Sequence, residues 1–179
     1  MAVKKDITLA KIKAKSKQLD KMEKYEIDEG EYAGSTISFY PIFTEPKIEE
    51  LLQEYQILIK EAEDKKIELS DQMTIHLLQF LTVKHFTHFK YSIPSELIGE
   101  GKKEGLLDWL EHFRKTGLYE LIVNEIFLQS EVKKVFDRVT TVLGADLFLQ
   151  GLEGEIQKKS QAFRDKFSKE VETIEKPLQ

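Results

Sequence analysis

Four histidines are the residues of this chain with the clearest potential for metal chemistry. His85 and His88 are three residues apart in a segment with helical spacing, so both imidazoles could lie on one face of a helix. His76 lies nine residues before His85, which places it on the other side of that helix. No acidic residue occurs between Ile75 and Tyr91 to complete a site, and the HExxH pattern is absent. We therefore predict no metal site, and we expect His85 to be a core histidine bonded to a carbonyl.

Other catalytic arrangements are missing from the sequence as well. The GxSxG pattern of serine hydrolases does not occur, and the absence of cysteine excludes thiolate nucleophiles, disulfides and cysteine-bound metals. The glycine- and lysine-containing stretch GEGKKEG at residues 99–105 lacks the GxxxxGK[ST] order of a phosphate-binding loop, and we interpret it as a flexible loop. We predict no catalytic residue, no bound cofactor and no enzymatic activity.

Carboxylates are plentiful, but they lie on the charged faces of the predicted amphipathic helices, most clearly on the helix that begins near Pro46. Solvent on such a face keeps carboxylate pKa values ordinary, so we interpret it as a solvated surface rather than an acidic site. The charged and polar residues of this face are Glu49, Glu50, Gln53, Glu54, Gln56, Lys60, Glu61 and Asp64.

The charge of the chain also limits its partners. A formal net charge of -5 with 33% charged residues argues against general affinity for nucleic acid, which needs clustered cations. No run of about 18 uncharged apolar residues occurs, and the basic N-terminal segment lacks the apolar core of a secretory signal. We therefore expect neither nucleic acid binding nor a membrane span.

The segment IHLLQFLTVKHFTHFKY, residues 75–91, must be positioned at the centre of the fold. Its apolar side chains recur around most of a helical circumference, and such a helix has to be covered by other elements. Ser70 or Asp71 is the expected cap, and Pro94 is expected to end the region. Amphipathic patterns predict covering helices at residues 46–62, 104–115, 118–127 and 129–143, with Gly117 as a left-handed cap and Trp109 in the core.

Residues 25–43 have a different character, with turn glycines and alternating β-branched and aromatic residues. This pattern predicts a short hairpin that ends at Tyr40 and Pro41. The fold class is therefore mainly α: a bundle of about five helices with a short N-terminal β-hairpin and a C-terminal extension helix. We predict a basic, flexible arm at residues 1–24, a core domain at 25–149 and a C-terminal helix or tail at 150–179. Contact of the arm with an acidic partner or phosphate is the alternative, because Ile7, Leu9, Ile12 and Leu19 give it some amphipathic character.

Two surfaces are candidates for contact with a partner or a second copy of the chain. The first is the aromatic face of the hairpin, and the second is the sparse apolar stripe near the C-terminus. Either set could equally pack within the chain. These candidates are Ile37, Phe39, Tyr40, Phe43, Phe163, Phe167 and Val171.

Several phrases in residues 25–143 carry a resemblance to a known family. VKHFTHF is followed by IPSEL, then by TGLYELI and by SEVKKVFDRV. In this order they resemble the tail assembly chaperones of long-tailed bacteriophages and prophages of Gram-positive bacteria. The lysine-rich arm and the region after Gly151 are outside this resemblance.

The resemblance implies a non-catalytic protein that binds the tape-measure protein, keeps it soluble and helps to recruit the tail-tube protein. It also implies a possible homo-oligomer that acts in the cytoplasm of the bacterial host and is not part of the mature virion. Two alternatives remain open from the sequence. One is a structural head or tail component of the phage particle, and the other is a metal-binding regulatory helical protein that uses His85 and His88.

Overall fold

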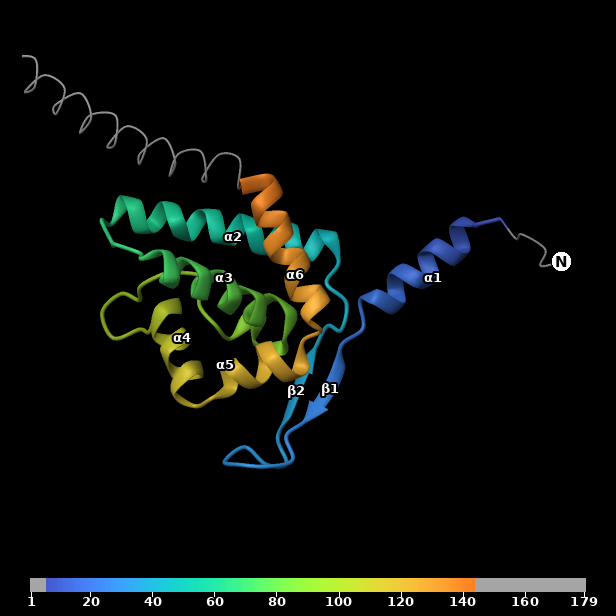
Figure 1. The fold of residues 1–179 in the computed structure, drawn as a ribbon, viewed down its shortest axis with the longest axis horizontal. Coiled ribbons are helices and arrows are strands. Elements are labelled where there is room, and N and C mark those ends of the chain that lie inside the picture. The colour runs from blue at the N-terminus through green and yellow to red at the C-terminus, as the bar shows by residue number, and fades with distance from the viewer. Residues whose placement is uncertain (1–5, 144–179) are drawn as a thin grey trace, which may run out of the picture. The chain divides into compact units, whose positions relative to one another are not determined.

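The computed structural model describes residues 6–143, with side chains through residue 141. The chain divides into two compact units, residues 1–135 and 136–179. The described part is mainly helical with one two-stranded antiparallel sheet, which confirms the predicted fold class (Figure 1). The α-helices are α1 (Leu9–Leu19), α2 (Glu45–Asp64), α3 (Asp71–Phe86), α4 (Leu106–Lys115), α5 (Leu118–Leu121) and α6 (Gln129–Arg138), and the strands are β1 (Glu23–Glu26) and β2 (Thr36–Phe39). Shorter helical turns are a 3₁₀ turn at His88–Tyr91 and π-helical turns at Ile122–Ile126 and Val139–Leu143.

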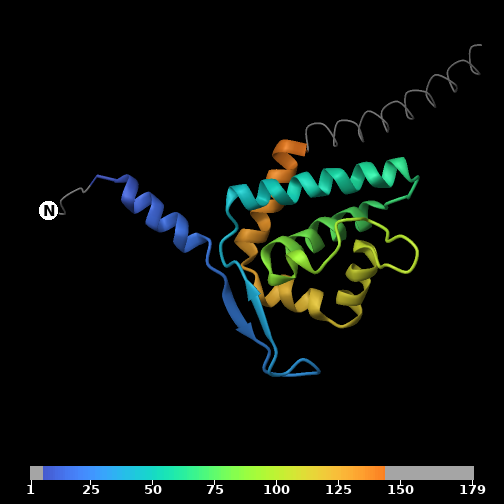
Figure 2. The same ribbon diagram turned by 180° about the vertical axis from the view of Figure 1, so that it is seen from behind.

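Helix α3 is the centre of the first unit, as its apolar circumference predicts. From Leu77 to Phe86 every side chain except Gln79 is buried. Helix α2 covers one side of α3, and α4 with the π-helical turn at Ile122–Ile126 covers the other (Figures 1 and 2). The Ser70 hydroxyl oxygen accepts from the Met73 N–H at 3.2 Å, which confirms the expected cap. The buried part of the helix begins at Leu77, two residues later than expected, because Ile75 is half exposed.

The central helix ends earlier than predicted, at Phe86 rather than near Tyr91. Thr87 takes up an extended conformation because it pairs with Phe39 at the end of β2. The Tyr40 N–H then donates to the Phe86 carbonyl at 2.9 Å. The Thr87 hydroxyl donates to the Val83 carbonyl at 2.8 Å and closes the last turn of α3. The hairpin therefore terminates the helix, and the helical pattern continues only as the 3₁₀ turn.

The hairpin pairs β1 with β2 in the register Tyr25 opposite Ile37. Gly30 and Gly34 have φ of 85° and 79° in the connecting turn, a left-handed conformation that glycine adopts without strain. Beyond β2, the Phe43 ring stacks on the Phe86 ring with centroids 3.6 Å apart. The hairpin thus packs against the helices, which supplies the tertiary support that an isolated hairpin lacks.

Helix α2 begins after Thr44 with Pro46 in its first turn, as expected from the sequence. Its buried side chains lie on one stripe and are Ile48, Leu51, Leu52, Tyr55, Leu58 and Ala62. Helix α4 leads into α5 through Gly117, whose φ of 71° confirms the left-handed cap. Trp109 is half-buried instead of lying in the core, because its ring is at the edge of α4 beside His112.

The GEGKKEG loop is closed by two glycines that approach other backbone atoms closely. A Cβ atom on Gly99 would lie 1.9 Å from the Lys103 carbonyl oxygen, and one on Gly105 would lie 2.4 Å from the Gly99 nitrogen. Because glycine has no Cβ atom, the two ends of the loop can come into close backbone contact before α4 begins.

The predicted C-terminal helix, with the predicted boundary at residue 149, lies outside the described residues. The predicted arm at residues 1–24 contains α1, a helix that the sequence interpretation did not assign. Within residues 6–143, no helix combines the length and apolar character that crossing a bilayer requires.

Candidate functional site

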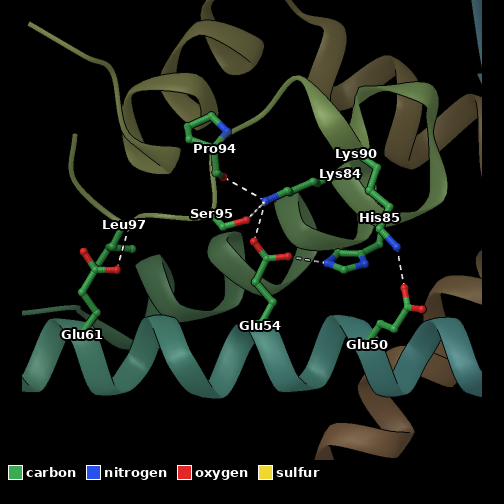
Figure 3. Close-up of polar contacts among 9 residues, drawn as sticks. All are labelled: Glu50, Glu54, Glu61, Lys84, His85, Lys90, Pro94, Ser95 and Leu97. Carbon is green, nitrogen blue, oxygen red and sulfur yellow. Dashed lines mark hydrogen bonds and ion pairs between the residues drawn. The ribbon is translucent and has the colours of Figure 1, made fainter. Parts of the chain in front are cut away.

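A buried polar cluster joins α2 to α3 and to the segment that follows the 3₁₀ turn (Figure 3). The Lys84 side chain is 2% exposed, although it carries a charge. Its Nζ lies 2.5 Å from Glu54 Oε1, 2.9 Å from the Pro94 carbonyl oxygen and 2.9 Å from Ser95 Oγ. An ammonium group has three donors, so these three acceptors satisfy it completely. Burial of this charge is tolerated because each of its hydrogens has a partner.

His85 shares the carboxylate of Glu54 with Lys84. Its Nε2 lies 2.6 Å from Glu54 Oε2, and an ionised carboxylate can only accept, so Nε2 carries the proton and donates. His85 Nδ1 is buried and has no hydrogen-bond partner among the described residues. The expectation that His85 bonds a carbonyl is therefore wrong, because a carboxylate from α2 reaches it instead.

Glu54 is stabilised in its charged form by both neighbours. Burial raises the pKa of Glu54, but hydrogen bonds from His85 and Lys84 and the charge of Lys84 outweigh burial. Together they lower the pKa of this carboxyl from 4.5 to about 2. Glu54 is therefore an anion across the physiological range, and it acts as the acceptor at the centre of the cluster.

Two further carboxylates of α2 extend this contact along the helix (Figure 3). Glu61 Oε2 accepts from the Leu97 N–H at 2.9 Å, and Glu50 forms an ion pair with Lys90. Burial raises the pKa of Glu61, but hydrogen bonds from Lys65 and Leu97 outweigh it and lower that pKa. Three glutamates of α2 thus hold α3, the 3₁₀ turn and the following segment.

The prediction of a solvated acidic face is wrong for Glu54 and Glu61, because their carboxylates lie in this contact. A signal for it exists in the sequence. Glu50, Glu54 and Glu61 fall within about 40° of one another on a helical wheel, beside the apolar stripe. Lys84 is a second signal, since a cation within a buried helix requires an anion nearby.

The cluster has the donors and acceptors of an acid–base pair, but its position limits what it can do. A general base must come within hydrogen-bonding distance of the proton that it abstracts. The Lys84 and His85 side chains are 2% and 5% exposed, and Glu54 is occupied by both of them. This arrangement supports a structural role, in which the cluster fixes the position of α2 on α3.

The remaining histidines are separate from this cluster. His88 does not share a helical face with His85, because α3 ends before Thr87. Its Nδ1 accepts from the Ser38 N–H at 3.1 Å. His112 pairs with Glu104 on the surface, and the His76 ring lies edge-on to Tyr119. Across residues 6–143, no group of three or more histidines, cysteines or acidic residues is arranged to hold a metal ion.

The predicted partner surface of the hairpin is largely internal. Ile37 and Phe43 are each 3% exposed, so both are core residues of the chain. Phe39 and Tyr40 are half-buried. For Ile37 and Phe43 the intramolecular alternative holds, because both are buried within the chain and the Phe43 ring stacks on Phe86 at the end of α3. The other candidates, Phe163, Phe167 and Val171, lie outside the described residues.

A further candidate surface lies on α1, in the segment for which the sequence left open contact with an acidic partner or phosphate. Within the described part of the chain this helix has no buried residue, and Ile7, Leu9 and Ile12 are 80%, 84% and 54% exposed. Leu9, Ile12 and Leu19 form an apolar stripe about 80° wide on the helical wheel. Lysines border the stripe on both sides: Lys11 and Lys15 on one, Lys13 and Lys17 on the other. We call this stripe with its lysines the α1 surface.

The α1 surface continues into a groove of about 800 Å³ between α1 and the start of α2. Its apolar lining comes from Ile7, Ile12, Leu19 and Pro46. Its cationic lining comes from Lys11, Lys15 and Lys47, and its acidic lining from Asp20 and Glu50. Lys47 Nζ lies 4.0 Å from the centre of the Tyr40 ring, a cation–π contact that anchors this side of the groove. The groove is thus lined by apolar side chains together with three cations and two carboxylates.

Comparison with known proteins gives a family for the chain. The family model described as YomO matches residues 9–178, which is most of the sequence and includes α1. No curated protein and no solved structure matches the chain. The name YomO is associated with phage and prophage proteins. This 179-residue chain therefore belongs to the YomO family.

Proposed function

We propose that this protein is a non-catalytic phage tail assembly chaperone, which binds the tape-measure protein and assists assembly of the tail tube. In this proposal it acts in the cytoplasm of the bacterial host and is not retained in the mature virion. The observation that carries the proposal is the groove between α1 and the start of α2, with exposed Ile7 and Ile12 in its lining.

The groove suits an apolar helical client for physical reasons. A client helix that covers Ile7, Leu9 and Ile12 removes apolar surface from water, at roughly 25 cal/mol per Å² buried. Such helix-in-groove binding uses side chains at helical spacing on one face of each partner. The phage-associated family name and the resemblance to tail assembly chaperones point to a tail protein as the client.

Co-expression with the tape-measure protein encoded by the same phage tests the proposal. We expect the tape-measure protein to move into the soluble fraction and to elute with this chain in size-exclusion chromatography. A tape-measure protein that stays equally insoluble with and without the chain would contradict the proposal.

A matched pair of variants distinguishes binding in the groove from a general effect of expression. Ile12→Asp places a charge in the groove, whereas Ile57→Asp places the same charge on a residue of α2 that is 64% exposed and outside the groove. The first variant should lose the client and the second should retain it. Mass spectrometry of purified virions tests the alternative of a structural component, which predicts many copies of the chain in the particle.

A further inference from the structure

We infer that the α1 surface binds an acidic amphipathic helix, in which an apolar stripe is bordered by glutamates or aspartates. This inference rests on the proposed function and adds the chemistry of the client segment. It depends on the charges around the groove, on the exposure of α1 and on the shape of the site.

The charges around the groove favour an anionic partner. Lys11, Lys15 and Lys47 line it, whereas Glu50, one of its two acidic residues, forms an ion pair with Lys90 outside the groove. Among the described residues, none of the four lysines of α1 forms a salt bridge with a carboxylate. A client with carboxylates beside its apolar stripe would therefore meet the cations that line the groove.

The exposure of α1 indicates that the helix gains support when a partner binds. Its 11 residues are fewer than the roughly 12–15 that an isolated helix needs to be stable in water. Local support comes from Thr8, whose hydroxyl oxygen accepts from the Lys11 N–H at 3.4 Å. A partner helix packed on Leu9 and Ile12 would supply the tertiary contact that α1 otherwise lacks.

The site fits a helix better than a lipid surface. Basic amphipathic helices that bind membranes present large apolar residues on an open, convex face. Here the apolar stripe is narrow and has no aromatic residue, and the start of α2 forms the opposite wall of the groove.

Binding of two synthetic helical peptides to the full chain tests the inference. Both peptides have the same length and the same apolar stripe, but one is bordered by glutamates and the other by lysines. We expect the glutamate peptide to bind with an affinity that falls as salt is raised, because salt screens exposed charges. We expect the lysine peptide not to bind, and we expect hydrogen exchange at residues 9–19 to slow only with the glutamate peptide.

Charge reversal provides the matched control. Lys11→Glu with Lys15→Glu should weaken binding of the glutamate peptide about tenfold and permit binding of the lysine peptide, because two attractions become two repulsions. Lys102→Glu with Lys103→Glu makes the same change of charge on the exposed 99–105 loop and should leave both affinities unchanged. Circular dichroism should show that all variants remain folded.

The outcomes separate the inference from the proposed function. Equal binding of the two peptides, or binding of neither, overturns the inference. Tighter binding to vesicles of anionic phospholipid than to the glutamate peptide also overturns it, and assigns the surface to a membrane. If the tape-measure protein becomes soluble but the two peptides bind equally, the proposed function stands and the inference fails. If the tape-measure protein stays insoluble but only the glutamate peptide binds, the inferred peptide specificity stands and the proposed function fails.

Discussion

The α2–α3 contact and the α1 surface use the same types of side chain in opposite environments. In the α2–α3 contact, Lys84 is 2% exposed and has three oxygen acceptors within 2.9 Å. On the α1 surface, Lys15 is exposed, and its closest acceptor, Gln18 Oε1, is 3.5 Å away. The charges of the α2–α3 contact are fixed by the fold, whereas the charges of the α1 surface are available to a partner.

The energetic consequences of a substitution should differ accordingly. Removal of one member of a buried ion pair leaves a charge without compensation and is strongly destabilising. Exposed charges contribute between about 0 and 1 kcal/mol, because water solvates them nearly as well. We therefore expect changes in the α2–α3 region to alter stability, and changes on the α1 surface to alter binding alone.

The largest effect should come from Phe86→Asp at the end of α3. Phe86 is 0% exposed and stacks on Phe43, so the variant places an unpaired carboxylate in the core. We expect the free energy of unfolding to fall by more than about 4 kcal/mol, which is comparable to the total stability of many domains. Circular dichroism and urea denaturation should show an unfolded or severely destabilised chain. Tyr91→Asp, at a residue 93% exposed, is the control, and destabilisation of similar size there would contradict the assignment of the core.

A smaller loss is expected for Lys84→Met, which retains most of the side-chain volume and removes the charge. Glu54 would keep only His85 as a partner, and the Pro94 carbonyl and the Ser95 hydroxyl would lose their donor. We expect the free energy of unfolding to fall by about 3 kcal/mol. The double variant Lys84→Met with Glu54→Leu should recover part of this loss in urea denaturation. A double variant as unstable as the sum of the two single variants would show that the two residues are not coupled.

The pH dependence of stability offers a second test of the cluster formed by Glu54, Lys84 and His85. The pKa of Glu54 is about 2 in the folded chain, below its ordinary value of 4.5. A carboxyl whose pKa is lowered by folding stabilises the fold above its unfolded pKa, and this contribution is lost as pH falls through the folded pKa. The difference in unfolding free energy between the parent chain and Glu54→Gln should therefore shrink as pH falls from 4.5 toward 2. A difference that stays constant across this range would contradict the ionic role of Glu54.

Much of the fold was predictable because local signals determine it. The apolar circumference of residues 77–86 requires a central helix, and Ser70 and Gly117 mark helix boundaries through their backbone preferences. The end of α3 was not predictable in this way. Thr87 is extended because it pairs with Phe39, which lies far away in the sequence, and the helical pattern continues past it without interruption.

The polar residues were harder to interpret than the apolar ones. Glu54 follows the same helical period as residues that face water, so its pattern alone does not show that it meets His85 and Lys84. The apolar stripe of α1 was underestimated for a related reason. Leu9, Ile12 and Leu19 give residues 1–24 a visible amphipathic character, but lysines dominate the composition and led to the prediction of a flexible arm.

The smallest effect on stability, with a large effect on binding, is expected for Ile12→Asp on the α1 surface. Ile12 is 54% exposed and α1 has no buried residue in the described part of the chain, so the unfolding free energy should change by no more than about 0.5 kcal/mol. The same carboxylate should abolish binding of a helical client, because it places a negative charge inside the apolar part of the groove. Urea denaturation and co-purification of the tape-measure protein measure the two quantities separately. Loss of stability comparable to that of Lys84→Met would show that α1 belongs to the folded core, and the distinction between the two regions would then fail.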